Sequence, residues 1–152
     1  MRIYIAGPLF SDMERSRNAR IRNLLLASGF ETYLPQEDAG TCYALIDKGL
    51  AKAEVRKALF EKDIEAVRNC DVIVCLLDGR VPDEGMCVEL GMAFALGKLC
   101  IGLKTDSRAM DKNGDSNIMI DGCLSRICAT EEELTAEMIA LRSRGQDVET
   151  RK

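Results

Sequence analysis

The stretch DEGMCVELGMAFALG, residues 83–97, is the segment around which the sequence is organised. It begins as a loop and continues with the apolar spacing of an amphipathic helix. The apolar residues that follow one another at intervals of three or four are Met86, Leu90, Ala93 and Leu96. We expect these four side chains to form the buried face of the helix.

Glu89 interrupts this apolar face. A carboxylate in such a position costs free energy unless it is paired, hydrogen-bonded or lining a cleft. Glu89 lies near the start of the expected helix, where free backbone amides and the macrodipole favour the ionised form. An ionised carboxylate facing an apolar cleft is a candidate nucleophile or general base. A buried glutamate with a purely structural partner would give the same pattern.

Length and charge narrow the class of protein. The chain has 152 residues, which is enough for one domain with its own core, and we expect a single domain over residues 1–152. With 25 acidic and 21 basic residues and no basic run, a nucleic-acid polymer is not an expected partner. The longest apolar run, residues 72–77, is too short to cross a bilayer, so we expect no membrane association. The first residues, MRIYIAGP, lack the features of a secretory signal.

The cysteine and histidine content restricts the chemistry. The seven cysteines form no CxxC motif and several lie within apolar runs, which is typical of buried thiols in a reducing compartment such as the cytoplasm. The chain has no histidine, so we expect no metal site. The absence of histidine also excludes Ser-His-Asp and Cys-His catalysis and leaves proton transfer to carboxylates, tyrosine, lysine or cysteine.

Strand and helix patterns alternate along the chain. Strands are expected at residues 2–6, 31–34, 71–77, 99–105 and 124–128. Helices are expected at about 13–28, at 44–69 in one or two pieces, within 83–97, and from a capping box at Thr130 and Glu133 to about 144, with loops at 36–43 and 106–117. This alternation predicts an α/β domain with a parallel sheet. No GxGxxG or Walker motif follows the first strand, so a dinucleotide or nucleoside triphosphate cofactor lacks its phosphate cradle.

The strand ends predict a cleft. In an open parallel sheet a ligand binds outside the carboxyl ends of the strands, where residues 7–10, 35–36 and 78–89 should converge. Asp63 interrupts an apolar helical face formed by Phe60, Ile64 and Val67, as Glu89 interrupts its own. Two acids placed where apolar residues are expected indicate one cleft for a small polar molecule.

Several segments in the same order resemble the nucleoside 2-deoxyribosyltransferases. They are IYIAGPLFS at 3–11, YLPQE at 33–37, Asp63 eight residues before Asp71, NCDVIVCLLDG at 69–79, and DEGMCVELGMAFALGK at 83–98. The resemblance implies a flavodoxin-like fold, in which a doubly wound five-stranded parallel sheet lies in a three-layer α/β/α arrangement. It implies transfer of a 2-deoxyribosyl group between nucleobases through a covalent glycosyl–enzyme intermediate. The implied partners are a nucleoside, a free nucleobase and further copies of the chain in a homo-oligomer with a shared active site, with no cofactor.

The resemblance also assigns roles to individual residues. Glu89 matches the nucleophile, Tyr4 a tyrosine that hydrogen-bonds and orients it, and Asp63 an acid that exchanges a proton with the base. The residues that match substrate-binding positions are Phe10 and Gln36 beside the base, Asp83 at the deoxyribose hydroxyls with Gly85 close by, and Asn117 and Met119 from a neighbouring subunit. A carboxylate suits this chemistry because it stabilises an oxocarbenium-like transition state before it bonds to the anomeric carbon.

Two other functions are compatible with the same fold. Related N-glycosidases cleave 2-deoxynucleoside 5′-monophosphates or pyrimidine nucleotides, and they need a phosphate pocket that Ser11, Arg15 and Arg80 could supply. Asp83 suits a neutral 5′-hydroxyl better, because a carboxylate repels a phosphate.

A receiver-type signalling domain is the more distant alternative. It would use Asp78, at the end of the third strand, as its phosphate acceptor. Such a domain binds Mg²⁺ through an acidic pair after the first strand, where this chain has Gly7 and Pro8.

Overall fold

The computed structural model of the chain describes residues 1–47, 49–108 and 117–149. Five parallel strands form one sheet in the order β2-β1-β3-β4-β5. The strands are β1 (Arg2–Ala6), β2 (Glu31–Tyr33), β3 (Val72–Leu76), β4 (Leu99–Leu103) and β5 (Arg126–Cys128). This is the five-stranded doubly wound sheet implied by the resemblance, and each strand lies within two residues of its predicted bounds.

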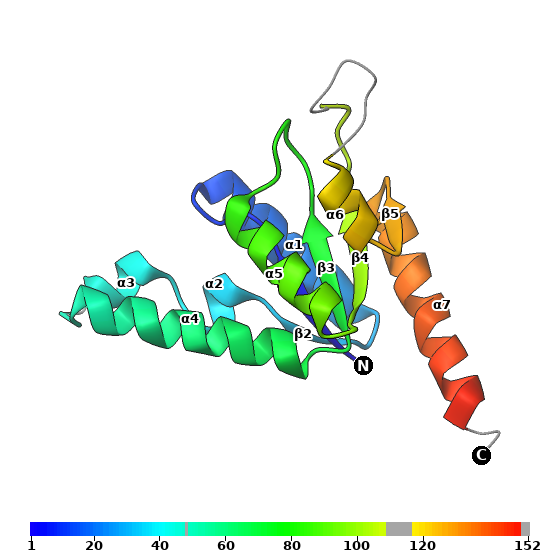
Figure 1. Cartoon of the computed structure of the whole chain (residues 1–152), viewed down its shortest axis with the longest axis horizontal. Coiled ribbons are helices and arrows are strands. Elements are labelled where there is room, and N and C mark those ends of the chain that lie inside the picture. The colour runs from blue at the N-terminus through cyan, green and yellow to red at the C-terminus, as the bar shows by residue number, and fades with distance from the viewer. Residues whose placement is uncertain (48, 109–116, 150–152) are drawn as a thin grey trace.

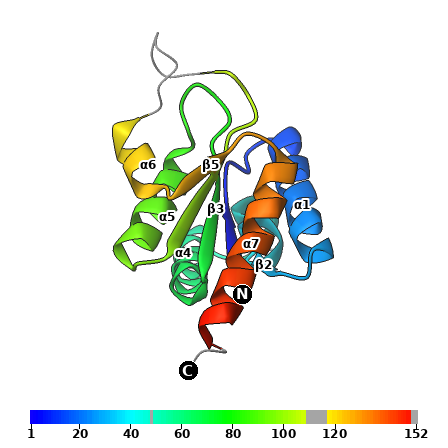
Figure 2. The ribbon, with the colours of Figure 1, turned by 90° about the vertical axis from the view of Figure 1, so that its right-hand side faces the viewer.

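Helices cover both faces of the sheet. They are α1 (Asp12–Ala27), α2 (Pro35–Asp38), α3 (Cys42–Ile46), α4 (Lys52–Asn69), α5 (Glu84–Ala95), α6 (Ile118–Cys123) and α7 (Glu131–Glu149). Figure 2 shows α1 and α7 on one side of the strands and α4, α5 and α6 on the other. The predicted three-layer α/β/α architecture is therefore confirmed. No helix within the described ranges has the length and apolar character needed to cross a membrane.

The central strand β3 explains why both faces need cover. All five of its residues are buried, and successive side chains point to opposite faces of the sheet. Val72, Val74 and Leu76 join the core beneath α1 and α7. Ile73 and Cys75 join the core beneath α4 and α5. A strand that is apolar at every position is stable only between two layers of helices.

Two predicted buried positions are wrong. Leu96 is 48% exposed, because α5 ends at Ala95 and Leu96 is its C-cap, beyond the face that packs on the sheet. Phe60 is 63% exposed, whereas Val67, two turns later on the same helix, is buried. Figure 1 shows that the first half of α4 runs with α3 past the edge of the sheet, which leaves Phe60 at the rim of a cavity and not in the core.

The connections differ from the prediction in three places. Residues 36–43 were expected to be a loop, but they contain most of α2 and the start of α3; Pro35 at the first turn and the bond from the Leu34 amide to Asp38 (2.7 Å) stabilise α2. Helix α6 was not predicted, and α7 continues to Glu149. Most of the expected loop at 106–117 lies outside the described residues.

The predicted cap of α7 is present. Thr130 Oγ1 accepts a hydrogen bond from the Glu133 amide at 3.1 Å. The Glu133 carboxylate returns to the amide of Ala129 at 2.8 Å, one residue earlier than in the standard capping box. A complete capping box, formed by Ser11 and Glu14, begins α1.

Candidate active site

Helix α5 delivers the central carboxylate to the carboxyl edge of the sheet. Asp83 is its N-cap and accepts a hydrogen bond from the Met86 amide at 2.9 Å. Met86, Leu90 and Ala93 bury one face of the helix against the sheet. Glu89 therefore points toward β1, because it lies between buried positions on the same helical face.

Tyr4 holds Glu89. Tyr4 is fully buried in β1, and its hydroxyl donates a hydrogen bond to Glu89 Oε1 at 2.7 Å. Burial and the neighbouring carboxylates Glu89 and Asp63 raise the pKa of Tyr4 far above its usual value. The phenol thus keeps its proton and acts as a fixed donor to Glu89.

A second pair of the same kind lies beside the first. The hydroxyl of Tyr33, in β2, donates to Asp63 Oδ1, on α4, at 3.0 Å. Tyr4 and Tyr33 are direct partners in the parallel pairing of β1 and β2, and their rings stack with centroids 5.4 Å apart. Sequence reasoning assigned no role to Tyr33. The YLPQE segment contains it, but its place opposite Tyr4 follows only from the strand register.

Glu89 and Asp63 line one cavity of about 240 Å³. The rest of its lining is almost entirely apolar and consists of Phe60, Ile64, Val67, Gly85, Val88 and Met92. An apolar cavity with a few convergent polar groups is typical of a site for a small ligand. In the described ranges, no group of three or more Cys, Asp or Glu side chains is placed to hold a metal ion.

Burial controls the protonation of both acids. It raises the pKa of Glu89 to about 8, a shift that the Tyr4 hydrogen bond opposes and the charges of Asp63 and Asp83 increase. The expectation that the helix start favours the ionised form is therefore wrong for this residue. Glu89 lies in the second turn of α5, and the first-turn amide of Met86 is already bonded to Asp83. Burial also raises the pKa of Asp63, against the opposing effects of Tyr33 and Lys62.

The predicted substrate residues divide into three places. Gly85 lines the cavity with Glu89, and a Cβ atom there would lie 3.0 Å from Asp83 Oδ2. Asp83 and the exposed Phe10 line a neighbouring cavity of about 620 Å³. Asn117 is the N-cap of α6, and Met119 is 75% exposed. Neither of these two cavities, which are formed by described residues, includes Asn117 or Met119 in its lining.

Gln36 is bound to helix α1. Its Nε2 donates to the backbone oxygen of Arg15 at 2.9 Å, and its Oε1 accepts from Asn18 Nδ2 at 3.0 Å. Asn18 is buried and also donates to the backbone oxygen of Pro8 at 2.8 Å. Asn18 thus links the loop after β1 to helix α2, a role that its position in a helical segment did not reveal.

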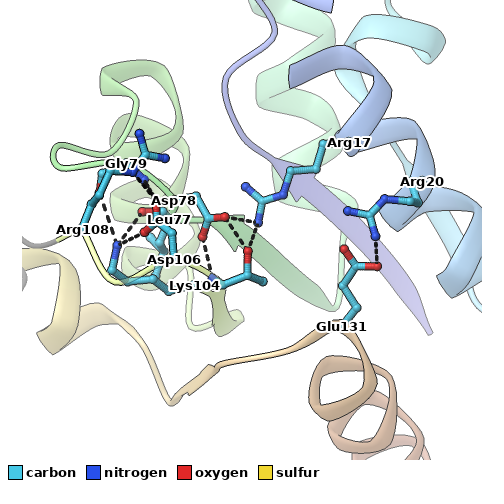
Figure 3. A network of polar contacts seen from close by, with 10 residues as sticks. Arg17, Arg20, Leu77, Asp78, Gly79, Lys104, Asp106, Arg108 and Glu131 are labelled. Carbon is cyan, nitrogen blue, oxygen red and sulfur yellow. Dashed lines mark hydrogen bonds and ion pairs between the residues drawn. The ribbon is translucent and has the colours of Figure 1, made fainter. Parts of the chain in front are cut away.

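Asp78 is engaged by structural partners. Figure 3 shows it between α1 and the end of β4, where it pairs with Arg17 at 2.8 Å and accepts bonds from Thr105 N and Oγ1, each at 2.6 Å. In the same network Asp106 accepts from the Gly79 amide and from Lys104, both at 2.9 Å. These contacts fasten the loop that leads to Asp83. They also argue against the receiver alternative, because the expected phosphate acceptor has its oxygens occupied.

The fold and the paired carboxylates define an α/β enzyme whose cleft suits a small polar substrate. The chain belongs to the nucleoside 2-deoxyribosyltransferase family, which it matches over residues 3–143. It is 32% identical over 120 residues to a nucleoside deoxyribosyltransferase of Limosilactobacillus fermentum, an alignment that covers 74% of this chain and 71% of that protein.

Solved structures share the fold. A conserved protein of Enterococcus faecalis V583 superposes with a TM-score of 0.74 at 28% identity, over 92% of this chain and 98% of that one. The CMP N-glycosidase BcmB of Clostridium botulinum superposes with a TM-score of 0.57 at 19% identity, over 91% of this chain and 98% of that one. At that identity the second similarity concerns the fold alone.

The raised pKa of Glu89 predicts a pH-dependent effect of Glu89→Gln on stability. Between the ordinary pKa of 4.5 and about 8, the folded protein retains a proton that the unfolded chain loses. The contribution of Glu89 to the free energy of unfolding therefore falls as pH rises through this range, by about 1.4 kcal/mol per pH unit. Glutamine keeps an oxygen for Tyr4 but does not ionise. We expect the variant to gain stability relative to the wild type from about pH 5 to about pH 8.

Urea unfolding at several pH values measures this difference. Glu54→Gln, at an exposed position of α4, is the matched control and should show no such trend. A Glu89→Gln effect that is constant over the whole range would contradict the assignment.

Proposed function

We propose that this chain transfers a 2-deoxyribosyl group from a nucleoside to a free nucleobase, with Glu89 as nucleophile and Asp63 as the acid that exchanges a proton with the base. The observation that carries the proposal is that both carboxylates line one apolar cavity, each held by a tyrosine hydroxyl. Membership of the nucleoside 2-deoxyribosyltransferase family supports the substrate class.

The first half-reaction releases the donor base. The C–N glycosidic bond breaks with its electron pair passing to the base nitrogen, and Asp63 gives its proton to the base. The anomeric carbon acquires oxocarbenium character and then bonds to a Glu89 oxygen. Tyr4 occupies Oε1, so Oε2 is the oxygen available for attack.

The second half-reaction reverses these events with a new base. A nitrogen of the incoming base bonds to the anomeric carbon, the Glu89 oxygen leaves with its electron pair, and Asp63 takes the proton from the base. Two displacements at one carbon retain its configuration, and the covalent intermediate gives ping-pong kinetics.

This cycle requires one proton shared between two nearby acids. Glu89 must be ionised and Asp63 protonated when the donor binds. Each carboxylate disfavours ionisation of the other, so the pair titrates as a unit. The 2.7 Å hydrogen bond from Tyr4 opposes the rise in the pKa of Glu89 to about 8, so it increases the fraction of molecules in which Glu89 carries the charge.

The neighbouring cavity suits the rest of the nucleoside. Asp83 uses Oδ2 to cap α5, which leaves Oδ1 for a sugar hydroxyl. Phe10 at the rim offers an apolar surface to a base. Gln36 would contact the base through the Nε2 hydrogen that it does not donate to Arg15.

Removal of the nucleophile should abolish transfer. Glu89→Gln preserves the bond from Tyr4 and the shape of the cavity. We therefore expect the rate of base exchange between deoxyinosine and adenine to fall about 10³-fold or more. Chromatography of the nucleosides formed measures this rate. Glu54→Gln should match the wild type. Full exchange by Glu89→Gln would exclude Glu89 as the nucleophile.

The β1–α1 loop argues against a nucleotide substrate. The amides of Phe10 and Ser11, which could bind a phosphate, instead donate to the carboxylate of Glu14 at 2.9 and 2.8 Å. Ser11 Oγ caps α1. Arg15 donates to the backbone oxygen of Leu9 and pairs with Asp12. Two of the three residues considered for a phosphate pocket are thus engaged locally.

The cavity of about 620 Å³ beside this loop is acidic. Its lining includes the carboxylates of Glu14, Asp78, Asp83 and Glu84. The two arginines in the lining, Arg17 and Arg108, are paired with Asp78 and Asp106. A phosphate entering beside Asp83 would therefore be repelled.

Glu14→Gln tests this discrimination. Glutamine also completes a capping box, so helix α1 keeps its cap while one negative charge is lost. We expect kcat/KM for a 2-deoxynucleoside 5′-monophosphate, relative to the nucleoside, to rise about two- to fivefold. Glu133→Gln, which changes the corresponding cap of α7, is the matched control. If the wild type releases base from the monophosphate and exchanges none with deoxyinosine, the N-glycosidase alternative is correct.

We further propose a homo-oligomer in which Asn117 and Met119 complete the site of a neighbouring subunit. Ile118 and Met119 form an exposed apolar pair on α6, away from the two cavities of their own chain, which supports this arrangement. The seven cysteines are free thiols and four of them are buried, which supports a reducing compartment, the cytoplasm.

Subunit mixing tests the shared site. Glu89→Gln and Asn117→Ala proteins should each be inactive alone. If each site takes Glu89 from one subunit and Asn117 from the other, a hybrid dimer contains one intact site. Mixing equal amounts of the two variants and allowing their subunits to exchange should then restore about a quarter of the wild-type rate of base transfer for a dimer. No recovery in a mixture shown to contain hybrids would contradict the shared site.

A further inference from the structure

We propose that Tyr33 is a positioning residue for the base-side acid, holding Asp63 in its orientation and linking it through Tyr4 to the nucleophile. The inference rests on the proposed function, because it takes Asp63 as the acid that exchanges a proton with the base. It adds a residue to which the resemblance assigned no role.

The geometry makes Tyr33 the counterpart of Tyr4. The two tyrosines are direct neighbours in the β1–β2 register, and their planes are 18° apart in the stack. Their hydroxyls reach two helices that pack against each other, α5 for Tyr4 and α4 for Tyr33. One stacked pair of rings therefore carries the hydrogen-bond donors of both carboxylates.

Tyr33 acts on the site through Asp63. Asp63 lines the 240 Å³ cavity that also contains Glu89, whereas Tyr33 lines a separate surface hollow with Arg2, Asp38 and Lys62. The phenol thus supports Asp63 from the side away from the substrate. Oδ1 accepts the Tyr33 hydrogen bond, which leaves Oδ2 to carry the exchangeable proton.

The hydrogen bond also adjusts the acid strength of Asp63. Burial raises the pKa of Asp63, and the Tyr33 hydroxyl and Lys62 oppose that rise. The second acid of the cavity is Glu89, on α5, and the Tyr4 hydroxyl, on β1, is close to both carboxylates. When the Oδ2 proton passes to the departing base, the carboxylate that remains is stabilised by Tyr33. Tyr33 keeps its own proton, because burial and Asp63 raise its pKa.

The hydroxyl can be removed without the ring. Tyr33→Phe keeps the stack on Tyr4 and deletes only the bond to Asp63. Because a hydrogen bond to a charged group is worth about a factor of ten or more, we expect kcat for deoxyinosine to fall about tenfold, with little change in KM. A donor whose base is already cationic, 7-methyl-2-deoxyguanosine, needs no proton from Asp63, so its kcat should fall less than about twofold.

A double-mutant cycle identifies the route of the effect. In the Asp63→Asn background, Tyr33→Phe should cause no further loss with deoxyinosine. Tyr43→Phe, at a tyrosine that is 74% exposed, is the matched control and should match the wild type. Thermal unfolding verifies that each variant is folded.

Three outcomes would overturn the assignment. The first is a wild-type kcat in Tyr33→Phe. The second is an equal fall in the kcat of Tyr33→Phe with deoxyinosine and with the cationic donor. The third is a fall in kcat caused by Tyr33→Phe that is as large in the Asp63→Asn background as in the wild type. The last two would indicate a structural role for the hydroxyl. Full base exchange by both Asp63→Asn and Glu89→Gln would instead refute the proposed function, so the two failures are distinguishable.

Discussion

The site depends on the partial compensation of two buried carboxylates by two tyrosine hydroxyls. Moving an ionised carboxylate out of water costs free energy, and the pKa of about 8 for Glu89 shows that one hydrogen bond from Tyr4 does not offset the whole cost. The same imbalance affects Asp63. Two acids that each hold a proton more tightly than in water can share one between them. That property suits a reaction in which a proton leaves with one base and returns with the next.

The sheet makes this compensation possible because it is rigid. Both tyrosines are on adjacent parallel strands, where the register sets them opposite each other. The opposite face of β1 carries Ile3 and Ile5 in the core beneath α1 and α7, so β1 cannot rotate without exposing apolar surface. The polar network of Asp78 and Asp106 holds the loop before α5, and Asp83 begins that helix. Helix α5, which carries Glu89, is therefore held at its start by this loop and its cap, and along its buried face by packing on the sheet.

Local pattern was sufficient for the alternating elements and for the two acids that interrupt apolar faces. The local pattern did not predict burial correctly at the end of a helix or beyond the edge of the sheet. Leu96 fits the apolar spacing of α5 but lies beyond its last turn, and Phe60 fits that of α4 but lies where the helix has passed the sheet. Periodicity describes which side of a helix a residue occupies, and it does not describe what that side contacts. Short helices such as α2 and α6 were not predicted, because one or two turns contain too few residues to show a helical period.

The sequence by itself determined the α/β alternation, the buried strand β3 and the anomalous places of Glu89 and Asp63, because these depend on the order of apolar and polar residues along the chain. Tertiary structure alone decided that Tyr33 faces Tyr4, that Gln36 is bound through Asn18 to α1, and that Glu14 occupies the amides after β1. These contacts join separate elements, and their partners are chosen by strand register and helix placement. It also decided the protonation of Glu89, because burial depends on the neighbours that folding brings to it and not on its position within a helix.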